Sequence, residues 1–266
     1  MIPYPNINPD LFRVGPLHVR WYGLMYILGF LAAYFLIKTE EKRKPVGLAP
    51  RPLQDLMFYL AIGLVAGARL GYVVFYQYMN LGDLVRDPLE IIAVWRGGMS
   101  FHGGLIGTVI AGWWFCRRKR LRFWAVADRV IVTAPIGLGL GRIGNFINGE
   151  LFGRPSEVPW AMIFPGGGPV PRHPSQLYEA FAEGLVLFVV LWILRRKGMR
   201  DGMMVAFFLL LYGAFRFLLE FFREPDAQIG FILGPLSMGQ LLSLGMFGAG
   251  LAVAFLVGRD HSSSDG

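Results

Sequence analysis

Residues 141–153 read GRIGNFINGELFG. They begin at the last residue of an apolar run, residues 123–141, that is long enough to cross a membrane. The segment places one arginine, two asparagines and one glutamate among four glycines. Polar groups are costly at membrane depth and are kept there for function. Glycines let backbone N–H groups approach an anion, and the guanidinium of Arg142 has a planar fork that fits phosphate. We therefore expect a ligand site here, and the structural alternative is a glycine-rich helix end that satisfies its own backbone.

Part of this segment also fits a nucleotide-binding pattern. Residues 139–144, GLGRIG, match G-x-G-x-x-G. That pattern binds dinucleotides when it follows a β-strand in a βαβ unit, whereas the residues before Gly139 are typical of a membrane helix. The nucleotide interpretation is therefore rejected.

The composition is typical of a protein that crosses the membrane several times. Of the 266 residues, 55% are hydrophobic and 15% are aromatic. The net charge of +8 comes from basic residues that cluster in short runs between apolar segments, which indicates membrane topology rather than a nucleic-acid partner. The single cysteine, Cys116, lies at the end of an apolar segment, and we expect it to be a packing residue without a catalytic role.

Apolar segments of membrane-spanning length predict an all-α, polytopic integral membrane protein that forms a single membrane-embedded domain over residues 1–266. Basic loops at 38–51, 117–122 and 195–200 alternate with less basic loops, so the positive-inside rule assigns these three to the cytoplasm. The N-terminus is then outside and the C-terminus inside. The seven predicted spans are 17–37, 53–76, 99–116, 123–141, 174–194, 203–222 and 237–257.

The remaining loops, 77–98, 142–173 and 223–236, are predicted to face outward. The middle loop is the longest and carries proline and glycine throughout. We expect it to form a small irregular cap over the outer face, between spans four and five.

Several ionisable residues fall within the predicted spans. Arg69 and Arg216 lie too deep for their side chains to reach the surface comfortably, so both are expected to face a polar cavity. Arg216, Glu220 and Arg223 are four and three residues apart, which puts them on one helix face as a ligand contact or as a tie between helices. The same outer level is predicted for Tyr22, His102, Arg142, Glu179 and Glu183.

His102 is followed by two glycines, which leaves room for a substrate to reach its ring. Its ability to exchange protons near neutral pH suits proton transfer, and a merely interfacial histidine is the alternative. The four histidines lack metal-ligand spacing and no G-x-S-x-G elbow occurs, so metalloenzyme and hydrolase interpretations lose support.

Residues 141–153 resemble the signature of the prolipoprotein diacylglyceryl transferase family. Supporting matches lie at 18–23, 97–104, 172–179 and 212–226, so the resemblance covers nearly the whole chain. It implies a bacterial inner-membrane enzyme with seven spans, a periplasmic N-terminus and an active site toward the periplasmic leaflet. It also implies transfer of the sn-1,2-diacylglyceryl group of phosphatidylglycerol to the lipobox cysteine of a preprolipoprotein signal peptide. A thioether forms and glycerol phosphate is released, and no metal or organic cofactor is required.

The resemblance and the predicted depth together assign roles to the polar residues. Arg142 and Arg216 are expected to bind the lipid phosphate, and His102 is the hypothesised base for the thiol. The remaining roles are headgroup or thiol positioning by Tyr22 and Tyr212, pocket shaping by Asn145 and Gly153, orientation of the arginines by Glu150 and Glu220, and added positive charge from Arg223.

Two other classes of function stay open at this point. A transporter or flippase for an anionic lipid or solute would use the same arginines in a cavity that opens to both faces. A membrane scaffold would use the arginines and glutamates only as ties between helices.

Overall fold

The computed structural model describes residues 2–5, 7–15, 17–76, 88–94, 97–224, 231–234 and 236–259. Internal contacts divide the chain into two compact units. Unit one comprises Met1–Leu36 and Asp128–Gly266, and unit two comprises Ile37–Ala127. The predicted outer loops 77–98 and 223–236, the tail 258–266 and the end of the matched segment 212–226 lie partly outside the described residues.

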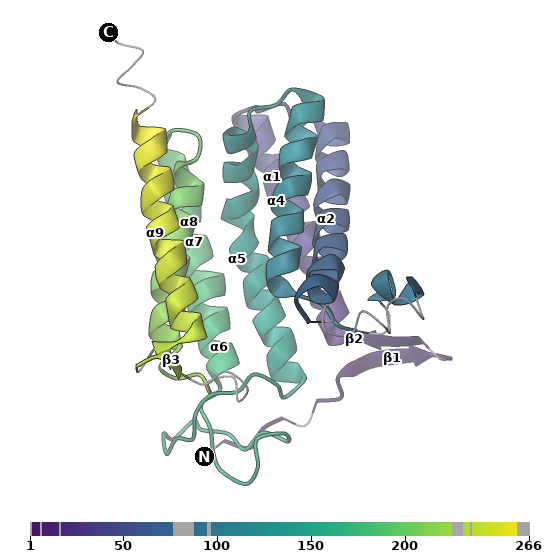
Figure 1. The fold of residues 1–266 in the computed structure, drawn as a ribbon, viewed down its shortest axis with the longest axis vertical. Coiled ribbons are helices and arrows are strands. Elements are labelled where there is room, and N and C mark those ends of the chain that lie inside the picture. Colours follow the sequence, from purple (N-terminus) through teal and green to yellow (C-terminus); the bar gives the residue numbers. More distant parts are fainter. Residues whose placement is uncertain are drawn as a thin grey trace. The chain divides into compact units, whose positions relative to one another are not determined.

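Unit one is built mainly from long helices (Figure 1). α1 (Trp21–Arg43) follows a hairpin of two antiparallel strands, β1 (Asp10–Val14) and β2 (Leu17–Arg20). A second short antiparallel pair, β3 (Phe231–Leu233) and β4 (Leu236–Ser237), precedes the last helix. The other helices are α5 (Phe123–Ile147), α6 (Ser175–Glu179), the π-helical η4 (Ala180–Val186), α7 (Leu187–Leu194), η5 (Arg195–Lys197), α8 (Met203–Leu219) and α9 (Met238–Arg259).

Unit two contains α2 (Pro50–Tyr76), the short η2 (Pro88–Ile91) and α4 (Phe101–Lys119). Glycines let α2 and α4 pack closely: a Cβ added to Gly67 would lie 2.7 Å from the Cα of Gly107, and one added to Gly71 would lie 2.7 Å from the Cα of Gly103. The spacing of these glycines predicts such close helix packing, and the structure confirms it.

A polytopic helical membrane protein is confirmed. Five helices are long and apolar enough to span a membrane, namely Trp21–Arg43, Pro50–Phe75, Phe123–Ile147, Ser175–Lys197 and Met238–Arg259. α8 is a shorter apolar helix, and α4 overlaps the remaining predicted span. The count of seven spans and the orientation of the two termini stay predictions.

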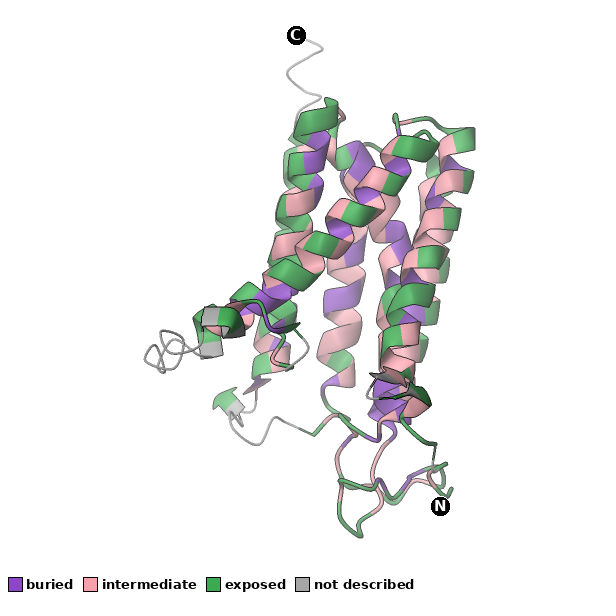
Figure 2. Ribbon diagram, turned by 90° about the vertical axis from the view of Figure 1, so that its right-hand side faces the viewer, coloured by how far each residue is buried: buried purple, intermediate pink, exposed green. Residues whose placement is uncertain are grey.

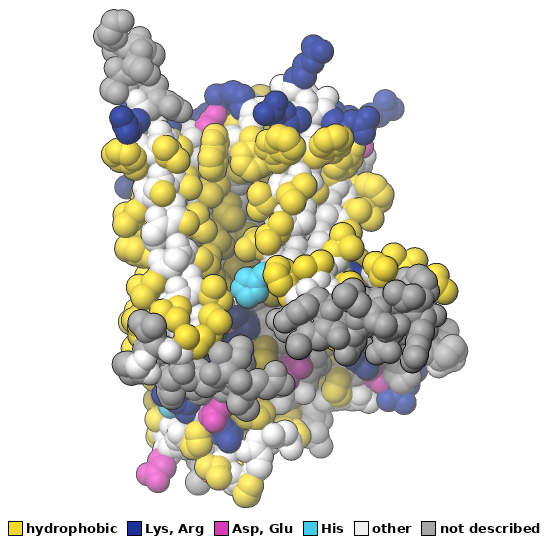
Figure 3. Space-filling view, viewed as in Figure 1, with side chains coloured by type: hydrophobic (Ala, Val, Ile, Leu, Met, Phe, Trp, Pro, Cys, Tyr) yellow, Lys and Arg dark blue, Asp and Glu magenta, His cyan; other side chains and the backbone are white. Residues whose placement is uncertain are grey.

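The surface of the helices matches a lipid environment rather than water. Exposed residues run along the flanks of the helices (Figure 2), and many of them are large hydrophobic side chains such as Phe35, Phe58, Phe181 and Phe255. Hydrophobic side chains cover the helices, and Lys and Arg lie mainly near the helix ends (Figure 3). Such a surface is stable only where lipid covers it.

The structure places several span boundaries a few residues from their predicted positions. Residues 17–20 form β2, so the first helix begins at Trp21 and not at residue 17. α8 ends at Leu219, which leaves Glu220 and Arg223 beyond the helix. α5 continues to Ile147 and stops where Gly149 adopts a positive φ of 67°, a conformation that favours glycine.

The extension of α5 shortens the predicted cap. Arg142 lies inside the helix, so the irregular loop begins after Ile147 rather than at residue 142. The loop has a small core of its own, in which Phe146, Met162 and Phe164 are buried. Tyr4 joins that core by donating its hydroxyl proton to the backbone carbonyls of Phe146 and Ile147, at 2.7 and 3.0 Å.

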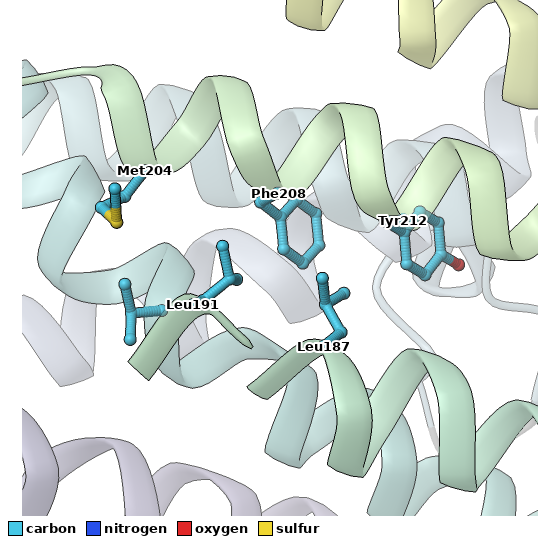
Figure 4. Packing of buried hydrophobic residues seen from close by; sticks show 6 residues of the cluster. Leu187, Leu191, Met204, Phe208 and Tyr212 are labelled. Atoms are coloured by element: carbon cyan, nitrogen blue, oxygen red, sulfur yellow. The ribbon is translucent and has the colours of Figure 1, made fainter. Parts of the chain in front are cut away.

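One hydrophobic core cluster of unit one joins α7 and α8 with Val132 of α5 (Figure 4). Leu187 and Leu191 from α7 face Met204, Phe208 and Tyr212 from α8. The ring of Tyr212 stacks on Phe208, with centroids 5.4 Å apart and planes within 6°. Figure 4 shows the Tyr212 hydroxyl directed away from the other labelled side chains, so this core fixes the ring and leaves its polar end free of the apolar packing.

Candidate functional site

Three arginines from different segments of unit one meet at one buried carboxylate. Glu179, the last residue of α6, is 1% exposed. Its Oε2 lies 2.6 Å from Nε of Arg142, and its Oε1 lies 3.5 Å from a terminal nitrogen of Arg216 and 3.7 Å from one of Arg223. The sequence identified Glu179 as an unusual residue of the outer level but gave it no role, and the structure makes it the centre of the cluster.

Arg216 also pairs with Glu220, four residues further along the chain. Its second terminal nitrogen lies 2.7 Å from Oε2 of Glu220, whose Oε1 accepts a hydrogen bond from the hydroxyl of Ser237 at 2.8 Å. Gly239 leaves space for that carboxylate, because an added Cβ would lie 2.6 Å from Cδ of Glu220. The predicted pairing of Arg216 with Glu220 is therefore confirmed, and the two terminal nitrogens of the guanidinium pair with different carboxylates.

Glu183 adds a second fully buried carboxylate, one turn beyond Glu179. It lies in η4, is 0% exposed, and its Oε2 is 3.9 Å from a terminal nitrogen of Arg142. Neither of its carboxylate oxygens has a hydrogen-bond partner within the described part of the chain. Glu183 therefore contributes negative charge to the cluster without the close contacts of Glu179.

Two tyrosines border Arg142 closely enough to interact with it electrostatically. Tyr22, in the first turn of α1, packs against Gly144, where an added Cβ would lie 2.8 Å from a ring carbon of Tyr22. Its hydroxyl is 3.4 Å from that of Tyr26. Tyr212 approaches from α8. The structure thus brings Tyr22, Tyr212, Arg142 and Arg216 into one unit, as the sequence predicts.

Asn145 and Glu150 form a separate hydrogen-bonded group at the end of α5. The side-chain amides of Asn145 and Asn148 donate to Oε1 of Glu150 at 2.9 and 3.1 Å. Gln176 donates to the backbone carbonyl of Glu150 at 2.6 Å. The expectation that Glu150 orients an arginine is not met, since the partners of its carboxylate among the described residues are these two amides. Its chemistry here is to fix the turn after α5.

Gly153 lies where three backbone segments cross. Its N–H donates to the carbonyl of His173 at 2.8 Å, and it forms an antiparallel bridge with Arg223. A Cβ at this position would lie 2.7 Å from Cβ of His173 and still closer to the carbonyl oxygen of Phe222. Only glycine fits without displacement of that backbone. The crossing holds the chain segment that brings Arg223 to Glu179.

A chain of polar contacts links the loop to α6. Nε1 of Trp160 donates to the hydroxyl of Tyr178 at 2.6 Å, and that hydroxyl lies 3.1 Å from Nδ1 of His173. The indole N–H can only donate, so the Tyr178 hydroxyl accepts from Trp160 and can donate its own proton to Nδ1 of His173. In a neutral His173 the ring proton then lies on Nε2. Burial lowers the pKa of His173, which favours this neutral form.

His102 and Arg69 belong to unit two, and the structure describes the two units separately. His102 is exposed in the first turn of α4, which Ser100 caps by accepting from the N–H of Gly103 at 3.2 Å. The expectation that Arg69 faces a polar cavity is wrong. Its side chain is 3% exposed and donates to the carbonyls of Gly97 and Gly98 at 2.6 and 3.1 Å, so it fixes the turn that precedes α4.

Metal coordination does not account for the cluster. Over the residues that the structure describes, no three His, Cys, Asp or Glu side chains are grouped to hold a metal ion. Arginine clusters instead bind anions, and guanidinium groups fit the oxygens of phosphate in a planar, two-pronged geometry. The arrangement around Glu179 can therefore hold a phosphate group and stabilise negative charge on it.

Comparisons with known proteins point to a single family. The family model described as Prolipoprotein diacylglyceryl transferase matches residues 9–256. A protein named phosphatidylglycerol–prolipoprotein diacylglyceryl transferase from Geobacter sulfurreducens is 55% identical over 256 residues, which cover 96% of this chain and 97% of the relative. Relatives of the same name are 51% identical in Bordetella avium, over 98% of this chain and 99% of the relative, and 49% identical in Desulfotalea psychrophila, over 94% and 93%.

Proposed function

Because the chain belongs to the prolipoprotein diacylglyceryl transferase family, we propose that it transfers the sn-1,2-diacylglyceryl group of phosphatidylglycerol to the cysteine thiol of a prolipoprotein signal peptide. The observation that carries this proposal is the meeting of Arg142, Arg216 and Arg223 at Glu179. Phosphatidylglycerol presents a phosphodiester, the kind of group that several guanidiniums bind together. The printed names of the relatives supply the two substrates.

The reaction displaces a phosphate ester from carbon. The sulfur of the signal-peptide cysteine forms a bond to the glyceryl carbon, the carbon–oxygen bond to phosphate breaks, and its electron pair stays on the phosphate oxygen. Negative charge therefore gathers on the departing glycerol phosphate, where the cations Arg142 and Arg216 stabilise it. The nucleophilic sulfur comes from the substrate, which agrees with the burial of the protein's single cysteine, Cys116.

The thiol must lose its proton before or during attack, because the thiolate is the nucleophile. In our proposal His102 accepts that proton, while Tyr22 and Tyr212 position the headgroup or the thiol. Asn145, Glu150 and Gly153 maintain the turn and the backbone crossing beside the cluster. Arg223 adds a third positive charge.

The proposal also includes the cellular setting. We place the enzyme in the bacterial inner membrane as one membrane-embedded catalytic domain, with its site toward the periplasmic leaflet and the loop after α5 as a periplasmic cap. The lipid donor then enters from the outer leaflet, and the lipobox cysteine of the signal peptide reaches the same level. The basic loops at 38–51, 117–122 and 195–200, which alternate with less basic loops, support this orientation.

A direct assay tests the reaction. The purified protein is reconstituted with phosphatidylglycerol and a lipobox peptide, and mass spectrometry follows the peptide for a diacylglyceryl adduct. We expect the adduct with the cysteine peptide and none with its Cys→Ser analogue or with phosphatidylcholine as the only lipid. A folded protein that yields no adduct, but moves lipid between leaflets, would instead support the transporter or flippase alternative.

A further inference from the structure

Glu179 lies where the three arginines of the cluster meet. Its carboxylate carries two anionic oxygens and contacts three guanidiniums, as a phosphate group does in an arginine-rich site. It is also almost completely buried, so its negative charge is compensated by these arginines rather than by water. The protein therefore carries its own anion at the centre of the cluster.

The carboxylates of the cluster lie within ion-pair distance of the arginine nitrogens. Nε of Arg142 lies 2.6 Å from Glu179, and a terminal nitrogen of Arg142 lies 3.9 Å from Glu183. One terminal nitrogen of Arg216 lies 3.5 Å from Glu179, and the other lies 2.7 Å from Glu220. An incoming phosphate must share these N–H groups with the glutamates or take them over, and Glu179 is the glutamate common to all three arginines.

We propose that Glu179 is a positioning residue that gathers the three arginines when no lipid is bound and yields part of its contacts to the lipid phosphate. This inference rests on the proposed function, since it assumes that the arginines bind phosphatidylglycerol. Glu179 lowers the affinity of the cluster for an anion, because it competes for the same donors. In return it holds guanidiniums from α5, α8 and the segment after α8 at the spacing that the departing phosphate requires.

Removal of the Glu179 charge should have opposite effects on lipid binding and on the rate of the chemical step. Glu179→Gln removes one negative charge from the cluster and should strengthen the binding of an anionic lipid. The same change releases the arginines from their common partner, and misplaced catalytic groups slow the chemical step. A merely structural role predicts a different result, because a smaller folded fraction lowers the measured kcat and leaves KM unchanged.

The experiment compares Glu179→Gln with wild type in kcat, in KM for phosphatidylglycerol and in thermal stability. We expect KM to fall about fivefold, a plausible size for one lost competing charge, and kcat to fall about 100-fold from the loss of positioning. A KM that is unchanged or raised overturns the proposal. Glu183→Gln is the matched control, because Glu183 is equally buried one turn away but lies 3.9 Å from a single arginine. Its kcat should stay well above that of Glu179→Gln, and equal losses would also overturn the proposal.

Two further arms keep the result decisive. If Glu179→Gln does not fold, Glu179→Asp keeps the charge and shortens the side chain by one methylene group, so kcat should fall while KM stays near wild type. A wild-type kcat in Glu179→Asp overturns the proposal.

Lipid binding in nanodiscs separates this inference from the proposed function, because it needs no turnover. Glu179→Gln should bind phosphatidylglycerol more tightly than wild type does, relative to phosphatidylcholine, and equal or weaker binding counts against it even if no transfer is detected.

Discussion

Gly139 of α5 and Gly184 of η4 touch where the two helices cross: a Cβ built on Gly184 would lie 2.7 Å from the Cα of Gly139. Arg142 lies one turn beyond Gly139, Glu183 immediately precedes Gly184, and Glu179 lies one turn before Glu183. The crossing therefore brings the guanidinium of Arg142 to its two carboxylates. Part of the G-x-G-x-x-G pattern is thus explained by helix packing.

We predict that Gly184→Ala lowers both stability and transfer activity, because the added methyl group must separate the two helices. Overpacking of this kind costs about 1–3 kcal/mol. Thermal unfolding in detergent and the initial rate of adduct formation measure the two effects. Gly141→Ala is the control, because a Cβ at that position would meet no described atom within 4 Å apart from its own stretch of helix. Equal behaviour of the two variants would show that the crossing is not tightly packed.

Asp128 of α5 caps the start of α8. Its carboxylate accepts from the backbone N–H of Gly202 at 2.7 Å and of Val205 at 3.0 Å, and Gly202 has no side chain of its own to serve as a cap. We expect Asp128→Ala to lower the free energy of unfolding by about 1–2 kcal/mol, as the loss of a helix cap does. Asp128→Asn keeps an acceptor oxygen and should lose less.

Asp55→Ala is a suitable comparison for the cap, because the Asp55 carboxylate makes an exposed ion pair with Lys119. Exposed pairs contribute about 0–1 kcal/mol. A loss in Asp128→Ala no larger than that in Asp55→Ala would contradict the assignment of Asp128 as a tertiary cap.

Lysine at position 142 or 216 keeps the charge and loses the planar fork. Arg142 spans Glu179 and Glu183, and Arg216 spans Glu179 and Glu220, which a single ammonium group cannot reproduce. We predict that Arg142→Lys and Arg216→Lys each lower the transfer rate about 100-fold with little change in folding. Arg118→Lys, on an exposed side chain of unit two, should keep the wild-type rate. Wild-type turnover in both cluster variants would rule out the phosphate role.

The sequence predicted the helices better than the contacts of the polar residues. Apolar runs locate each helix, since a span must be apolar along its length. The end of α5 was misplaced because Arg142 and Asn145 are polar, whereas the helix continues until Gly149 permits a turn. The polar residues therefore do not indicate where the helix ends.

The spacing of residues in the sequence cannot predict which residues of different helices contact one another. Arg216 and Glu220 are four residues apart, and the last turn of α8 with Glu220 as its C-cap brings the two together. Arg142 and Glu179 meet only because α5 and η4 cross at two glycines, and nothing in a single sequence matches Gly139 to Gly184. Arg69 shows the same limit, because a depth estimate cannot reveal that two backbone carbonyls lie within its reach.

The contact between Tyr178 and His173 should make the protein sensitive to acid. Burial holds the pKa of His173 below its ordinary value, so the unfolded chain binds the proton more readily than the folded one does. The stability that neutral His173 contributes is complete above about pH 6.5, the ordinary value for histidine, and is lost as the pH falls. We predict that wild type loses more thermal stability between pH 7.5 and pH 5.5 than His173→Gln does; parallel curves for the two proteins would contradict this reading.

His102 is the proposed acceptor of the thiol proton, and its exposed place in the first turn of α4 leaves its ring accessible. Glutamine has a similar size and hydrogen-bonding capacity but cannot accept the proton. We therefore expect His102→Gln to lower kcat by about 10²–10⁴-fold, the usual contribution of a general base, without a comparable loss of thermal stability. The variant should also regain rate at high pH, where the peptide thiol ionises without help. His173→Gln provides the control for histidine loss in general, and a His102→Gln enzyme with the full wild-type rate across the pH range would remove His102 from the mechanism.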